Sequence, residues 1–215
     1  MSRTAIAIPP ALARRRNRVL RPRDAGDVYA HPRAELSRLV HSGAMRRVAT
    51  GYYVLVPQEW IGDDRWRPDL DAAALGLAQT DYGADAVALV DVSAARHHGA
   101  IPRALAVSVV AVPKQRPTLD TAYGRVIFVN RDAGRLDLER VDTPLTSGWV
   151  TTVEQTLLDI AARPTQGGLA EADAAAAVRA LGTRVDWDLV ERLAREQHRP
   201  GALRAALRMA ERDGA

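Results

Sequence analysis

The sequence predicts an α+β fold, with an N-terminal winged helix-turn-helix followed by a mixed α/β domain that ends in a helical C-terminal tail. Residues 20–57 carry helix, turn and strand signals in the order of a winged helix. Residues 105–141 contain β-rich runs, and residues 169–212 repeat apolar side chains at helical spacing. We therefore expect one domain at residues 1–58 and a second at 67–215, joined by a linker at about 57–69.

Two helices are expected at the start of the winged region, each opened by a proline. Pro22 lacks the amide hydrogen that would stay unpaired in a first helical turn, and Ala25, Val28 and Tyr29 then share one face. Pro32 ends this helix, because the residue before a proline is pushed out of helical geometry, and Pro32 can open the next helix.

The second helix and a hairpin complete the winged region. Leu36, Leu39 and Val40 form the apolar stripe of this helix, and Gly43 ends it because glycine tolerates the left-handed conformation at a helix C-terminus. Strand-forming residues and a glycine turn follow directly. The hairpin is expected as a strand at 46–48, a turn at 49–51 and a return strand at 52–56.

The face of the second helix that points away from the apolar stripe is polar and basic. His31 and Arg33 lie at the helix start, the end that usually enters the major groove of DNA, and the wing would place charge near the flanking phosphates. The alternative is a solvated helix that happens to end in a hairpin. The residues predicted to contact DNA are His31, Arg33, Ser37, Arg38, His41, Arg46, Arg47 and Thr50.

Charge is distributed unevenly along the 215 residues. Residues 1–57 hold 11 arginines and three acidic residues, a net charge of +8, and since the chain totals +4 the remainder carries −4. A basic end on a mildly acidic body is typical of a protein that contacts a polyanion. We expect a first helix that starts near Pro9 and Pro10 and has Ile8, Leu12, Val19 and Leu20 along one side; its arginines are either solvated or in contact with phosphates.

Composition and motifs exclude several function classes. The absence of cysteine excludes disulfides, thiolate chemistry and a zinc finger. No run of about 18 apolar residues and no signal-peptide pattern occur, so we expect no membrane contact and a cytoplasmic location. The sequence has no Walker loop, GxGxxG motif or metal-ligand cluster, so no catalytic residue, cofactor or metal is predicted.

Beyond the winged region, the sequence pattern predicts a linker followed by further helices and strands. Trp60 and Trp66 of the linker are expected to pack the two domains together. Thr152 and Gln155 have the spacing of a capping box, which predicts a helix that starts after Thr152. The other helices are expected at 70–79, 86–98, 169–181, 186–197 and 200–212, and strands at 105–112, 125–130 and 136–141.

Two sets of residues raise the question of catalysis. Ser93 and His97 are four residues apart on one expected helix, but a usable nucleophile needs a strained turn and an oriented base, and neither is visible. We therefore favour a packing role for this helix. Asp159 is either a buried partner for an arginine or a catalytic carboxylate, and we favour the structural role.

Three segments together resemble the AbiEi family of antitoxins and transcriptional regulators from type IV toxin-antitoxin systems, in particular its actinobacterial members. They run from about Leu20 to Pro164 and cover most of the chain. The first segment is similar to the wing of that family. The second is similar to a family helix with small residues that ends in His-Gly, and the third to a family segment with a threonine before its helix. In this chain they read RRVATGYYVLVP, VDVSAARHHGA and WVTTVEQTLLDIAARP.

The resemblance implies an N-terminal winged helix, a mixed α/β antitoxin domain and two partners. Family members repress their own operon by binding inverted repeats, so we expect operator DNA as one partner and a homodimer as the DNA-bound form. They also counteract a co-encoded nucleotidyltransferase toxin, in many cases without a stable complex. The chain departs from the family at Gln155, where arginine is common, and it lacks the nuclease-like extension of some relatives, so no nuclease activity is expected.

Two other functions stay open. The C-terminal domain could neutralise a toxin chemically, as an atypical protein kinase, which would need cationic phosphate binders and a carboxylate. Lys114, Arg116, Glu154 and Asp159 are available for this role, although no spacing singles them out. The chain could also be a regulator unconnected with any toxin. The enzyme class is the less favoured of these readings.

Overall fold

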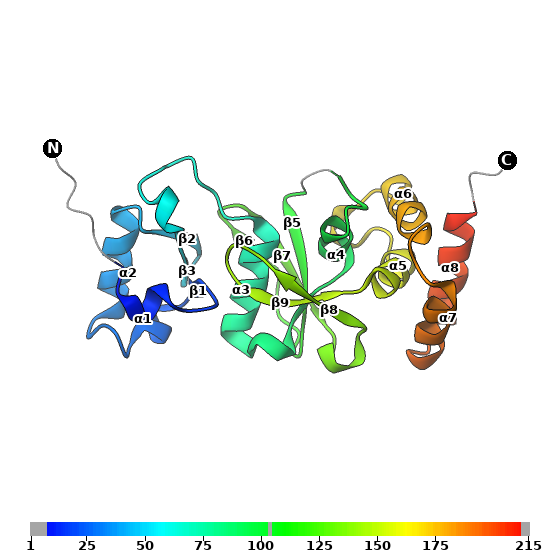
Figure 1. Ribbon diagram of the computed structural model, residues 1–215, viewed down its shortest axis with the longest axis horizontal. Coiled ribbons are helices and arrows are strands. Elements are labelled where there is room, and N and C mark those ends of the chain that lie inside the picture. The colour runs from blue at the N-terminus through cyan, green and yellow to red at the C-terminus, as the bar shows by residue number, and fades with distance from the viewer. Residues whose placement is uncertain (1–7, 103–104, 212–215) are drawn as a thin grey trace.

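The protein is described by a computed structural model that covers residues 8–102 and 105–211. Figure 1 shows three parts along the long axis: an N-terminal unit, a central sheet and a group of C-terminal helices. Helices and mixed sheets occur together, so the predicted α+β class is confirmed. Within these residues every helix is too short or too polar to cross a membrane.

The N-terminal unit, residues 8–57, combines helices with a small antiparallel sheet in which β3 lies between β1 and β2. Its hydrophobic core contains Leu12, Leu20, Leu36, Leu39 and Leu55, which are all buried. The helices therefore cover one side of this sheet. The elements are α1 (Pro10–Ala13), β1 (Val19–Leu20), a 3-10 helix (Pro22–Ala25), α2 (Pro32–His41), β2 (Met45–Ala49) and β3 (Tyr52–Leu55).

Helix α2 and the hairpin form where the sequence predicts them. Pro32 occupies the first turn of α2, and the chain leaves the helix through Gly43, whose φ is +78°. At that angle glycine is favoured because a side chain would clash with the backbone. Gly51, with φ of +81°, makes the turn between β2 and β3.

Two predictions for this unit are wrong. The helix expected after Pro22 is only a 3-10 turn that ends at Ala25, because the Asp24 carboxylate accepts a hydrogen bond from the Arg21 amide and closes a tight turn. Val19 and Leu20 do not line a helix but form β1, since α1 stops at Ala13 and β3 supplies hydrogen-bond partners for an extended chain.

The central sheet has the strand order β6-β7-β5-β4-β9-β8 within the described residues. Neighbouring strands β5 and β7 are parallel, as are β4 and β9, and the other pairs are antiparallel. Every residue of β5 is buried, as expected for a central strand covered on both faces. The strands are β4 (Ala88–Leu89), β5 (Val107–Val112), β6 (Leu119–Thr121), β7 (Gly124–Asn130), β8 (Leu138–Asp142) and β9 (Ser147–Thr151).

Helices cover both faces of the central sheet (Figure 1). Val110 and Val112 of β5 pack in the cluster that includes α3, whereas Val109 and Ala111 pack in the cluster of the other helices. This alternation follows from the two-residue period of a strand. The helices are α3 (Leu70–Tyr82), α4 (Asp91–His97), α5 (Val153–Ala162), α6 (Glu171–Gly182), α7 (Trp187–Glu196) and α8 (Pro200–Ala210).

The structure corrects the reading of residues 86–98 as one helix. Ala88 and Leu89 form β4, which pairs with β5 and β9, and helix α4 begins only at Asp91. Asp91 has a φ of +51°, so the chain turns there and the apolar residues before it stay extended. Strands β6 and β9 were also not predicted as strands. The end of the last predicted helix, at Arg212, lies outside the described residues.

The N-terminal unit packs directly on α3. Asn17 donates a hydrogen bond to the Gly76 carbonyl at 2.7 Å, and a Cβ added at Gly76 would lie 2.7 Å from Val19. The two linker tryptophans were expected to pack the domains together, and this holds only for one of them. Trp66 packs against the hydrophobic cluster that contains Val19 and the residues of α3, but Trp60 is 44% exposed. The close approach at Gly76, rather than Trp60, joins the unit to the body.

Candidate nucleic-acid interface

A groove of about 1030 Å³ lies between the start of α2 and the β2–β3 hairpin. It brings together side chains from the 3-10 turn, from the start of α2 and from the tip of the hairpin. Its described lining contains arginines, a histidine and hydroxyl groups but no acidic residue. The lining residues are Arg21, Pro22, Arg23, Ala30, His31, Pro32, Arg33, Ala34, Ser37, Arg47, Thr50, Gly51 and Tyr53.

Five of the eight residues predicted to contact DNA line this groove. They are His31, Arg33 and Ser37 on the α2 side and Arg47 and Thr50 on the hairpin side. The Arg47 guanidinium donates a hydrogen bond to the Thr50 hydroxyl at 3.0 Å, which orients it along the hairpin tip. Residues that are up to 19 positions apart in sequence therefore share one basic, concave surface.

The other three predicted residues lie outside the groove lining. Arg38 forms an ion pair with Glu35 at 2.6 Å, one helical turn away. Arg46 pairs with Asp64 at 3.2 Å and donates to the Asp63 carbonyl at 2.9 Å, so its charge is directed to the segment after the hairpin.

His41 also points elsewhere, because its Nδ1 is 2.7 Å from the Ser37 carbonyl of its own helix. A carbonyl only accepts hydrogen bonds, so Nδ1 of His41 carries the hydrogen. Helical periodicity placed Arg38 and His41 on the polar side of α2 correctly, but it could not show which part of that side borders the groove.

Arg21 and Arg23 line the groove, and the sequence reading did not select them. The only signal for them was the general density of arginines before residue 24, because the segment was expected to be a helix. Their position depends on the 3-10 turn and on a contact with the body. Both side chains reach Asp81 on α3, at 2.8 Å from Arg21 and 3.5 Å from Arg23.

Asp81 is the centre of a polar network between the N-terminal unit and the body. It accepts hydrogen bonds from the Tyr52 hydroxyl at 2.5 Å, from Arg116 at 2.7 Å and from Arg21 at 2.8 Å, and it forms an ion pair with Arg23. Burial opposes its ionisation, but the hydrogen bonds from Tyr52, Arg21 and Arg116 outweigh this effect and lower the pKa of Asp81. The carboxylate thus stays ionised and holds Arg21 at the groove edge.

A second polar cluster lies in the interior between α5 and the C-terminal helices. Asp159 has no exposed side-chain surface and accepts hydrogen bonds from Arg131 at 2.5 Å and Arg199 at 2.6 Å. Gln155, one turn earlier on α5, donates to the same carboxylate at 3.1 Å and also bonds to Gln197. The prediction that Asp159 is a buried partner of an arginine is confirmed.

Asp91 is buried close to this cluster and pairs with Arg163 at 3.3 Å. Burial and then the negative charge of Asp159 raise the pKa of Asp91 to about 6 from 3.8, although Arg163 acts in the opposite direction. The folded protein therefore binds a proton more tightly at Asp91 than the unfolded chain does. Its contribution to stability is complete below about pH 3.8 and is lost as the pH rises through about 6.

We expect Asp91→Asn to remove this pH dependence. Asparagine tolerates the positive φ at this position, so the backbone should be retained. The stability of the native chain relative to the variant should fall by roughly 2 kcal/mol between pH 4 and pH 7, since one pKa unit is worth about 1.4 kcal/mol and part of the effect lies below pH 4. Urea unfolding of both proteins at several pH values measures this difference. Parallel pH profiles for the two proteins would contradict the assignment.

The candidate catalytic residues are engaged in structural contacts. Ser93 is fully buried and bonds to Asp71 at 2.6 Å and to the Val109 amide at 2.8 Å, whereas His97 is exposed. Ser93 and His97 thus form no dyad in the described structure.

The residues named for a kinase are also separated by their contacts. Arg116 pairs with Asp81, Asp159 is enclosed by Arg131 and Arg199, and Glu154 accepts the Asp186 amide.

Comparison with known proteins relates the C-terminal part of the chain to a protein family. A protein-family model described as AbiEi antitoxin C-terminal domain matches residues 86–209, which is more than half of the chain. The match begins before β4 and ends within α8, so it covers strands β4–β9 and helices α4–α7 in full. No curated protein matches the chain.

Proposed function

The chain belongs to the AbiEi antitoxin family, and from this premise we propose that it represses its own operon by binding operator DNA through the N-terminal unit. The proposal includes a toxin as the second partner, a co-encoded nucleotidyltransferase whose effect the chain counteracts. The observation that carries the DNA-binding part is the basic groove between α2 and the hairpin.

The order of elements supports a winged helix-turn-helix in the N-terminal unit. Strand β1 precedes the 3-10 turn and α2, and it pairs with β3, the second strand of the hairpin. In such a unit α2 is the recognition helix, and the hairpin with Gly51 at its turn is the wing. This division corresponds to the domains that we propose at residues 1–58 and 67–215.

The groove has the chemistry of a DNA-binding surface. In this proposal Arg33 and Ser37 on α2 donate to base edges, while Arg47 and Thr50 on the wing contact phosphates; their common lining of the groove supports these roles. Arg21 and Arg23 extend the positive charge along the edge. We expect two chains to bind the two halves of an inverted repeat, because a two-fold operator mirrors a two-fold protein.

Gel-shift titration with the intergenic DNA upstream of the gene tests the proposal. The full chain should bind this fragment more tightly than a shuffled fragment of equal length, and the affinity should fall steeply as the salt concentration rises. Equal affinity for both fragments would rule out operator recognition. Mutation of the groove residues, described in the Discussion, then assigns the binding surface.

The antitoxin part of the proposal has its own test. A nucleotidyltransferase encoded next to the gene should stop growth when expressed alone, and co-expression of this chain from an unrelated promoter should restore growth. The Arg33→Ala/Arg47→Ala variant should restore growth equally well, since the promoter no longer depends on DNA binding. If growth does not recover with the native chain at matched expression, the antitoxin part is wrong.

A further inference from the structure

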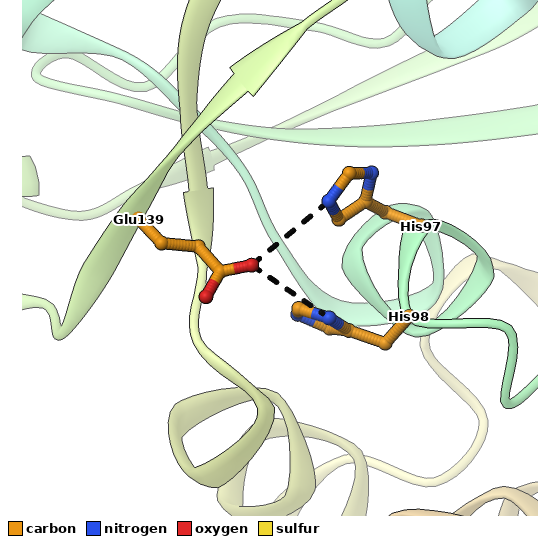
Figure 2. A group of neighbouring side chains, drawn as sticks. All are labelled: His97, His98 and Glu139. Atoms are coloured by element: carbon orange, nitrogen blue, oxygen red, sulfur yellow. Dashed lines mark ion pairs between the residues drawn. The ribbon is translucent and has the colours of Figure 1, made fainter.

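We propose that His97, His98 and Glu139 form a binding site for a divalent transition metal of the zinc type. Figure 2 shows Glu139 of β8 pointing toward both imidazole rings at the end of α4. One ligand atom from each residue lies within 4.8 Å of the other two. Imidazole nitrogens and a carboxylate oxygen are ligands that zinc prefers, and two histidines with one glutamate are a known zinc ligand set.

His98 is already oriented as a metal ligand. Its side chain is only 4% exposed, and its Nε2 lies 2.7 Å from the Thr151 carbonyl oxygen. Because a carbonyl oxygen only accepts, Nε2 carries the hydrogen, and in the neutral ring the lone pair is on Nδ1. Nδ1 is the atom that faces Glu139 Oε1, at 3.9 Å.

Metal-bound histidines commonly donate their second ring nitrogen to a carbonyl or carboxylate, which holds the ring orientation and the tautomer. The Thr151 carbonyl does this for His98. The backbone of His98 is also held, because Arg184 donates to its carbonyl oxygen at 2.6 Å. This ligand is therefore in place before a metal binds.

In the structure, Glu139 Oε1 lies near both histidine rings but forms no hydrogen bond with either of them. Glu139 Oε1 is 4.0 Å from His97 Nε2 and 3.9 Å from His98 Nδ1, and both distances are longer than a hydrogen bond. When the His98 ring carries its hydrogen only on Nε2, two atoms with lone pairs, Oε1 of Glu139 and Nδ1 of His98, face each other without a hydrogen between them. A cation placed between them and bound also by His97 would satisfy both.

The site needs only a small adjustment to close around a metal. Zinc bonds of about 2.0–2.1 Å place tetrahedral ligand atoms roughly 3.3 Å apart, so the side chains must approach by about an ångström. His97 and Glu139 can do this because their side chains are 36% and 46% exposed.

The sequence reading found no metal cluster because Glu139 is far from the two histidines along the chain. The pairing depends on β8 lying beside β9, whose last residue, Thr151, orients His98. The inference does not depend on DNA binding or on the toxin, since the three residues lie on the body and outside the basic groove.

Isothermal titration of the full chain with Zn²⁺, after removal of any polyhistidine tag, tests the site. We expect one zinc per chain. His97→Ala and Glu139→Gln should each weaken binding by about 100-fold or more, since even outer-shell partners of a metal ligand change affinity by 10- to 100-fold. His41→Ala, which removes an exposed histidine far from the cluster, should leave the affinity unchanged.

Two further measurements make the outcome decisive. Zinc at a 100-fold excess over its Kd should raise the Tm of the native chain by about 5–10 °C and leave the Tm of Glu139→Gln unchanged. Co²⁺ should give visible d–d absorption in the native chain and none in His97→Ala. Equal zinc affinity in the native chain and both ligand variants, or no binding at all, would overturn the proposal.

Discussion

Replacement of Arg33 and Arg47 together by alanine should weaken binding to operator DNA by about 100-fold. The two side chains lie on opposite sides of the groove, one at the start of α2 and one on the hairpin. Loss of an arginine contact to a base or phosphate costs about 1–3 kcal/mol, and two independent losses add. The salt dependence should also become less steep, by about one unit of slope for each phosphate contact removed. Gel-shift titration at several salt concentrations measures both effects.

Arg38→Ala combined with His41→Ala is the matched control for this experiment. It removes one arginine and one histidine from the same helix, but Arg38 pairs with Glu35 and His41 bonds to its own helix. We expect this variant to lose much less affinity than the groove variant. The opposite order would place the DNA-binding face on the outer side of α2, as helical periodicity alone suggested, and would exclude the groove.

Asp159→Ala should lower the free energy of unfolding by about 3–5 kcal/mol, which corresponds to a fall in Tm of about 10 °C or more. The carboxylate is fully buried between Arg131 and Arg199. Without it, the mostly buried guanidinium groups of Arg131 and Arg199 lose their ion-pair partner, and leaving these charges unpaired costs more than the pair itself contributes. Gln155 also loses a hydrogen-bond acceptor. Thermal and urea unfolding of the purified variant test this expectation.

Asp132→Ala provides the comparison for Asp159→Ala. It makes the same chemical change in an ion pair with Arg135, but both side chains of that pair are largely exposed to water. Exposed pairs contribute about 1 kcal/mol or less, so the Tm should change little. Similar effects of the two substitutions would show that Asp159 is not a stabilising centre of the C-terminal half.

Local signals in the sequence were sufficient for several elements of the fold. Pro32 marks the start of α2 and Gly43 marks its end, because each residue restricts or permits backbone conformations at its own position. Thr152 caps α5, where its hydroxyl accepts the Gln155 amide, as the capping-box spacing predicts. The three C-terminal helices also follow from apolar periodicity, since each has one face in the core.

Elements that depend on partners far away in the sequence could not be predicted from local signals. The short strand β4 has a residue pattern that also suits a buried helix, and only its pairing with β5 and β9 decides between them. The 3-10 turn after Arg21 is similar, because Asp24 and Asp81 hold it through side-chain contacts. Arg21 and Arg23 were missed as groove residues for this reason.

The sequence by itself determined the α+β class, the family resemblance, the basic character of residues 1–57 and the limits of the helices with local caps. These features depend on residue composition and on interactions within a few positions of the chain. Tertiary structure decided which arginines share a groove and that Glu139 faces His97 and His98. It also decided that Asp81 and Asp159 each pair with arginines from separate elements. The physical reason is that a side chain's charge and hydrogen bonds act over a few ångströms in space, and only the packing of helices and strands brings distant residues within that range.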